Sequence, residues 1–168
     1  MIVPTLVEIL IRAGVKKENI TIVIALGTHR VMTDTELETK LGRYVVDNFE
    51  VANYPCTDEA LFLNMGVSKS GIPAWINKAV ANADLRIGLG TIFPHMSSGY
   101  SGGCKILLPG VCNDTTVEEF HARECFSENR VGDESCPMRR DMEEFVMGSN
   151  LLDFVVNVVT TREGSVFK

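Results

Sequence analysis

The sequence predicts an α/β fold, a layered and mostly parallel sheet with helices on both faces, similar to a Rossmann fold. Short β-branched runs alternate along the chain with segments whose apolar residues recur at helical spacing. This alternation is typical of parallel strands joined by helices. The chain has 168 residues, the length of one ordinary domain. We therefore expect residues 1–168 to form a single α/β domain.

The expected elements follow one another without repeats or long linkers. Apolar spacing predicts a first helix over residues 2–13, which Gly14 ends. A capping box formed by Thr33 and Glu36 predicts a second helix from Asp34 to about Gly42. Residues 74–83 are expected to be helical in part and residues 102–108 to form a helical turn or two. Helices are expected over residues 115–125 (capped by Asn113 or Asp114) and 137–147. Strands are expected over residues 20–26, 50–54, 61–67, 85–89 and 152–160.

Composition and charge exclude several classes of protein. The net charge of −6 argues against nucleic-acid or anionic-membrane partners, because those surfaces bind a basic face. No apolar run reaches the roughly 18 residues of a membrane span, and residues 1–14 lack the features of a signal peptide. Five cysteines without C-x-x-C spacing favour reduced thiols. We therefore expect a cytoplasmic protein.

Both ends of the chain read as cut. The first helix begins at Met1 with no strand before it, although a parallel βαβ sheet normally has one there. Residues 165–168 read as the beginning of another element. These two features predict a fragment of a longer chain, with the sheet truncated at both ends.

Residues 93–110 are the most informative stretch for function. They place His95, a run of serines and glycines, and Lys105 between two apolar segments. Small residues let a backbone approach a ligand closely and offer N–H groups to anions. Histidine carries protons near neutral pH. Three apolar residues follow Lys105. Two interpretations of Lys105 therefore stay open, a partly buried amine with a lowered pKa and a solvated lysine.

The histidines follow the predicted strands. His29 comes after the strand over 20–26 and His95 after the strand over 85–89, and the carboxyl ends of parallel strands are where such sheets bind ligands. His121 lies on the helix that follows Lys105. The competing interpretations are a structural loop residue for His29 and a surface residue for His121.

Three familiar motifs fit poorly. Gly88 and Gly90 follow a strand, but Phe93 stands where a dinucleotide fingerprint needs its third glycine. Cys104 before Lys105 does not fit a Walker phosphate loop. His121 and Cys125 share a helix face, yet their spacing fits no zinc template, and buried cysteines acting as small hydrophobes are favoured.

The chain resembles the lactate racemase family, whose members use a nickel-pincer nucleotide. The residues that carry the resemblance are Gly27–Arg30, Met32–Thr33, Glu36–Leu37, His95, Gly99–Gly103, Lys105 and Leu108–Gly110. The separations among His29, His95, Lys105 and His121 also match the family. The resemblance covers essentially the whole chain, which is less than half as long as a full member.

This resemblance implies an activity and a role for each residue. It implies racemisation or epimerisation of a small 2-hydroxy acid, lactate or a relative, by reversible hydride transfer to the cofactor. His29 and His95 would be the acid/base pair. Lys105 would hold the cofactor covalently and His121 would ligate its nickel. Further cofactor contacts are expected from the small residues of the loop, Ser101, Gly102 and Gly103.

The resemblance also implies what lies outside the chain. Residues 1–168 would be a fragment of the N-terminal catalytic domain of a two-domain protein, whose missing C-terminal domain closes the cleft. We therefore expect the isolated chain to be inactive. Two other interpretations stay open, a non-catalytic anion- or nucleotide-binding module of the same fold, and a hydrolase or transferase that uses Lys105 or a cysteine as nucleophile.

Overall fold

A computed structural model describes residues 2–160 and confirms the expected α/β fold with parallel strand pairs. The helices are α1 (Ile2–Arg12), α2 (Asp34–Leu41), α3 (Arg43–Asn48), α4 (Lys78–Ala81), α5 (Asp114–Glu124) and α6 (Pro137–Gly148). The strands are β1 (Thr21–Val23), β2 (Glu50–Ala52), β3 (Phe62–Val67), β4 (Pro73–Asn77), β5 (Ile87–Ile92), β6 (Pro94–His95), β7 (Gly99–Tyr100) and β8 (Phe154–Val159). Short 3-10 turns are η1 (Lys17–Asn19), η2 (Glu59–Leu61) and η3 (Gly103–Ile106). The element expected from residue 165 lies outside the described residues.

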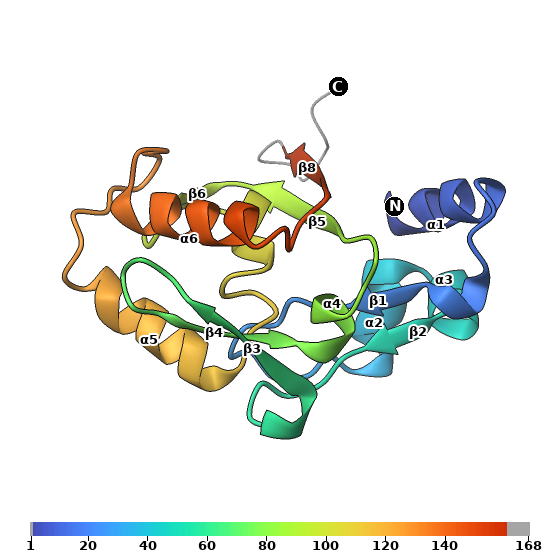
Figure 1. Cartoon of the computed structure of the whole chain (residues 1–168). Coiled ribbons are helices and arrows are strands. Elements are labelled where there is room, and N and C mark those ends of the chain that lie inside the picture. Colours follow the sequence, from blue (N-terminus) through green and yellow to red (C-terminus); the bar gives the residue numbers. More distant parts are fainter. Residues whose placement is uncertain (1, 161–168) are drawn as a thin grey trace.

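Two parallel strand pairs form the frame of the molecule. β1 pairs with β2, starting at Thr21 opposite Glu50, and β5 pairs with β8, starting at Ile87 opposite Phe154. Figure 1 shows the β1–β2 pair beside α1, α2 and α3 in one half, and the β5–β8 pair beside α6 in the other. The antiparallel hairpin β3–β4 packs against α5.

Each half has its own hydrophobic core. The core around β1 buries apolar side chains of α1, α2 and α3 and of the residues that flank β1 and follow α3, namely Val7, Ile20, Ile24, Leu26, Leu37, Leu41, Val45 and Phe49. The other core joins β4, η3, α5 and α6, and its fully buried centre consists of Ile72, Ala74, Ile76, Leu108, Phe120, Met142 and Val146. Val23 of β1 also packs against this second core, so apolar contacts connect the two halves as well.

The helix signals of the sequence have clear structural counterparts. Thr33 and Glu36 form both hydrogen bonds of the capping box that starts α2. Gly42 adopts a left-handed φ of 87° and separates α2 from α3, a helix that the sequence analysis did not distinguish. The side chain of Asn113 accepts a hydrogen bond from the Thr116 N–H and caps α5. Of the two candidate caps, Asn113 is thus the one used.

Residues 74–83 are helical in part, as expected. Residues 73–77 form β4, and Lys78–Ala81 is the helical part. The reason is an alternation with a period of two residues, since Ala74 and Ile76 are fully buried while Trp75 between them is partly exposed. Asn77 then caps the short helix, because its side chain accepts a hydrogen bond from the Ala79 N–H.

Gly110 joins the two halves of the molecule. Its N–H donates to the carbonyl of Lys105, and its own carbonyl accepts a hydrogen bond of 2.9 Å from the N–H of Gly27. A side chain cannot be added here, because a Cβ atom would overlap the carbonyl of Ile106. The end of β1 and the turn that carries Lys105 are thereby fixed next to each other.

None of the helices between residues 2 and 160 has the length and apolar character that crossing a membrane requires.

We expect Gly110→Ala to lower the free energy of unfolding by about 1–3 kcal/mol, since the methyl group would collide with a backbone carbonyl that has little freedom to move. Gly148→Ala is the matched control. Nothing lies within 4 Å of the methyl group that it adds at the end of α6, so stability should stay the same or rise slightly. Urea denaturation measures both. Equal effects of the two substitutions would contradict the role of Gly110.

Candidate active site

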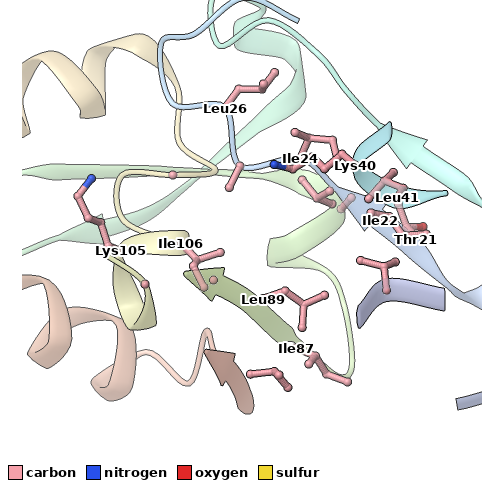
Figure 2. Close-up of a pocket in the computed structure, with 18 of the residues that line it drawn as sticks. Thr21, Ile22, Ile24, Leu26, Lys40, Leu41, Ile87, Leu89, Lys105 and Ile106 are labelled. Atoms are coloured by element: carbon pink, nitrogen blue, oxygen red, sulfur yellow. The ribbon is translucent and has the colours of Figure 1, made fainter. Parts of the chain in front are cut away.

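An open cleft of about 1950 Å³ lies between the two halves of the molecule. Figure 2 shows apolar side chains of β1 and β5, among them Ile22 and Leu89, toward one end of the cleft and Lys105 at the other. Six of the seven predicted site residues line this cleft, namely His29, His95, Ser101, Gly102, Lys105 and His121. Gly103 is not part of the lining. The fold thus brings together side chains that are far apart in the sequence.

His95 lies on the small hairpin formed by β6 and β7. The N–H of Ser97 donates a hydrogen bond of 3.1 Å to its Nδ1, which orients the ring and leaves the proton of the neutral imidazole on Nε2. Burial lowers the pKa of His95, the positive charges of Lys105 and His121 lower it further, and Glu124 opposes them. Both effects favour the neutral ring.

Lys105 lies on η3, and its side chain is largely withdrawn from solvent. Burial lowers the pKa of its amine, and the nearby guanidinium of Arg139 lowers it further, whereas Glu124 raises it. Within residues 2–160, no hydrogen bond or ion pair to the Nζ atom is found. Of the two interpretations that the sequence leaves open for Lys105, the structure favours the partly buried amine, and this is the environment that makes a lysine nucleophilic.

His121 lies on α5 and is oriented by a carboxylate that the sequence analysis missed. Its Nδ1 is 2.8 Å from Oε2 of Glu124, whose side chain is only 19 % exposed. With Nδ1 engaged, Nε2 is the nitrogen left for another partner, which is the usual arrangement of a histidine that ligates a metal. The sequence could have indicated this contact, because His121 and Glu124 are three residues apart on a helix and residues at that spacing share a face.

His29 comes from the other half of the molecule. It follows β1 in a turn in which its N–H donates to the carbonyl of Leu26, and its side chain is exposed to the cleft. The adjacent Arg30 forms an ion pair with Glu36, and this contact lowers the pKa of Glu36 to about 2. The turn is thus fixed to the start of α2 while the ring of His29 faces solvent.

The serine and glycines of the loop hold the turn together. The Ser101 hydroxyl donates to the carbonyl of Thr91 and accepts from the N–H of Phe93. The N–H of Gly103 donates to the side chain of Asn157 on β8 at 3.2 Å, and a Cβ atom on Gly102 would collide with the same side chain. These contacts give the small residues a structural role, and their contact with a cofactor stays a prediction.

The cysteines offer neither a metal site nor an activated thiol. Cys56, Cys104, Cys112 and Cys136 are buried, and burial raises the pKa values of the first three. A raised pKa disfavours the thiolate that a nucleophilic cysteine needs. Cys125 is exposed and donates to the carbonyl of His121. Among residues 2–160, no group of three or more histidine, cysteine or acidic side chains could hold a metal ion.

An α/β frame whose cleft contains histidines from two sides and a desolvated lysine defines a class, a ligand-binding domain equipped for acid/base chemistry. The family model described as the lactate racemase N-terminal domain matches residues 1–133 of this chain. The chain therefore belongs to the lactate racemase family, as the resemblance implied.

Individual relatives agree with this assignment. The chain is 31 % identical over 155 residues to a lactate racemase of Lactiplantibacillus plantarum, covering 91 % of this chain and 37 % of the relative. It is 35 % identical over 153 residues to a lactate racemase of Thermoanaerobacterium thermosaccharolyticum, covering 89 % of this chain and 35 % of the relative. The chain thus spans little more than a third of the length of these curated relatives.

Solved structures share the fold. The lactate racemase apoprotein from Thermoanaerobacterium thermosaccharolyticum superposes with a TM-score of 0.83 at 31 % identity, covering 89 % of this chain and 36 % of that one. A protein from Thermotoga maritima superposes with a TM-score of 0.80 at 23 % identity, covering 98 % of this chain and 44 % of that one. The second likeness concerns the fold alone.

The charges around His95 can be tested one at a time. We expect Lys105→Met to raise the pKa of His95, because a nearby positive charge is removed while the side-chain volume is nearly kept. Glu124→Gln should lower the pKa of His95, because it removes the charge that opposes the shift. NMR titration of the imidazole protons measures both, and Lys40→Met in the same cleft is the control that should change nothing. Shifts in the opposite directions would contradict this account of the site.

Proposed function

We propose that this chain carries the acid/base pair and the cofactor tether of a racemase or epimerase for a small 2-hydroxy acid, lactate or a relative. The observation that carries the proposal is that His29, His95, Lys105 and His121 line one cleft although they come from separate elements. Histidines from both halves favour this function over a non-catalytic anion-binding module, because binding alone needs no pair of acid/base groups.

The side chains of the cleft fit a covalently held nickel-pincer nucleotide. Lys105 offers an amine whose pKa burial lowers and that has no protein partner among residues 2–160. His121 offers Nε2, while Glu124 holds Nδ1. When bound, this cofactor supplies a reversible acceptor for the substrate hydride. Among residues 2–160, no cluster of three or more side chains could hold the nickel. His121 alone would therefore ligate it, and the cofactor itself would supply the other ligands.

The two histidines move the hydroxyl proton of the substrate. A racemase needs an acid/base group on each face, because the two enantiomers present their hydroxyl groups to opposite sides. Burial and the positive charge of Lys105 lower the pKa of His95, which favours the neutral ring that a base needs. His29 follows β1 in the other half of the molecule, which the hydrogen bond between Gly27 and Gly110 connects to the half that carries Lys105. It acts on the other face of the substrate.

Proton exchange at His95 is coupled to its hairpin. While Ser97 donates to Nδ1, the neutral ring holds its own proton on Nε2. To accept the substrate proton at Nε2, the ring must carry its proton on Nδ1 and release the Ser97 N–H. The hydrogen bond from Ser97 therefore favours His95 as a hydrogen-bond donor at Nε2 and has to be given up before the ring acts as a base there.

The tether is tested by mass and metal analysis of the chain made in a host that synthesises the cofactor. We expect an added mass on Lys105 together with nickel, and the loss of both in Lys105→Ala. Lys40→Ala is the matched control, because Lys40 also lines the cleft, and it should keep the adduct. Chain that stays unmodified although Lys105 reacts with an amine reagent would contradict the proposal and favour the binding module.

The contribution of the rest of the protein is tested by turnover. We expect the 168 residues alone, even with cofactor attached, to show no racemisation of lactate, since the chain spans little more than a third of the lactate racemases that it matches. Chiral chromatography of either enantiomer after incubation measures this. Racemisation well above that of Lys105→Ala would overturn the expectation.

A further inference from the structure

One buried cation lies behind the cleft and has no part in the function proposed above. Arg139 is the third residue of α6, and its side chain is only 10 % exposed. A buried guanidinium is costly unless its donors are paired. Three donor nitrogens of Arg139 are paired with protein oxygen atoms, and these hydrogen bonds compensate the burial of the charge.

Two of its partners are backbone carbonyls of the hairpin that carries His95. Nε donates to the carbonyl of Ser98 at 3.0 Å, and Nη2 donates to the carbonyl of Tyr100 at 2.7 Å. These residues flank Gly99, which pairs directly with His95 across the hairpin. The guanidinium group is a planar and rigid fork, so its donors can hold these two carbonyl groups at a fixed distance and orientation.

The remaining donor is held by α6 itself. Nη1 of Arg139 donates to Glu143 at 2.6 Å, one helical turn further on. The carboxylate balances the buried charge and fixes the direction of the fork. Arg139 therefore reaches the hairpin from a helix that is already anchored in the core through Met138 and Met142.

The hairpin has a second anchor next to the first. The N–H of Gly132 donates to the carbonyl of Gly99 at 2.8 Å, and a Cβ atom on Gly99 would collide with the backbone of Asp133. Ser97 and Ser98 are almost fully buried. The turn between His95 and Gly99 is thus held from outside by α6 and by the loop before it.

We propose that Arg139 is a positioning residue that sets the orientation and tautomer of His95 by holding the Ser98 and Tyr100 carbonyls. The connection runs through Ser97. Its N–H donates to Nδ1 of His95 and belongs to the turn that Arg139 holds. The inference rests on the proposed role of His95 as an acid/base group, but its test needs neither cofactor nor substrate.

Nitrogen chemical shifts of the histidine rings test the proposal, since they distinguish the two neutral tautomers. The chain has three histidines, and His95→Asn assigns the signal of interest. In the unsubstituted chain we expect His95 to hold its proton on Nε2. Arg139→Met should reduce this preference to that of a free histidine side chain, in which both tautomers are populated. Arg139→Lys keeps the charge but not the fork, so it should also lose most of the preference.

Two controls separate positioning from stability. Arg86→Met removes another inward guanidinium, which donates to the carbonyls of Val80 and Ala81 and does not touch the hairpin. It should destabilise the chain and leave the His95 tautomer unchanged. Glu143→Gln keeps Arg139 in place and should have a smaller effect than Arg139→Lys.

The outcomes are distinct. An unchanged His95 tautomer in folded Arg139→Met, or in Arg139→Lys if the first variant does not fold, would make Arg139 a stabilising residue only and overturn the inference. A lost preference in both Arg139 variants but not in Arg86→Met supports it. If Arg139→Lys kept the full preference of His95 for a proton on Nε2, the positive charge alone would account for the effect, and the inference would also be overturned. Failure of the chain to acquire a cofactor changes none of these readings.

Discussion

The backbone of Gly110 is the constraint on which the cleft depends. Its N–H closes the turn that presents Lys105, and its carbonyl accepts the N–H of Gly27 at the end of β1. No side chain fits at this position, because the carbonyl of Ile106 occupies the space. The backbone of this residue therefore helps to hold the turn of His29 beside the turn of Lys105, although each half of the molecule has its own core.

The pKa shifts in the cleft arise because several basic side chains lie near one another in a partly buried space. His95, Lys105 and His121 are close enough to influence one another, and burial disfavours the charged forms of the first two. Glu124 is the carboxylate that opposes this crowding, and it also orients His121. The balance leaves His95 and Lys105 closer to neutral than they would be in water, which suits a base and a nucleophile.

The site is supported by elements that contribute no reacting group. Asn157 on β8 holds the N–H of Gly103, and Arg139 on α6 holds the hairpin of His95. Ser101 connects the hairpin back to β5. Loops that carry function need such external supports, since their own backbone hydrogen bonds are few and ordering them costs conformational entropy.

The sequence by itself determined the α/β class and the cap of α2 through local spacing, and it left the cap of α5 open between Asn113 and Asp114. Its motifs carried the resemblance to the family, and through that resemblance it predicted six of the residues that line the cleft. Tertiary structure alone decided that residues 73–77 form a strand, since the alternation of Ala74 and Ile76 has meaning only against β3 and α5. It also decided which polar groups support the site. Arg139 and Asn157 are distant in sequence from His95 and Gly103, and hydrogen bonds between distant segments leave no periodic signal in the chain. Glu124 lies between these cases, because its helical spacing from His121 is local, while its influence on His95 and Lys105 arises only from the fold.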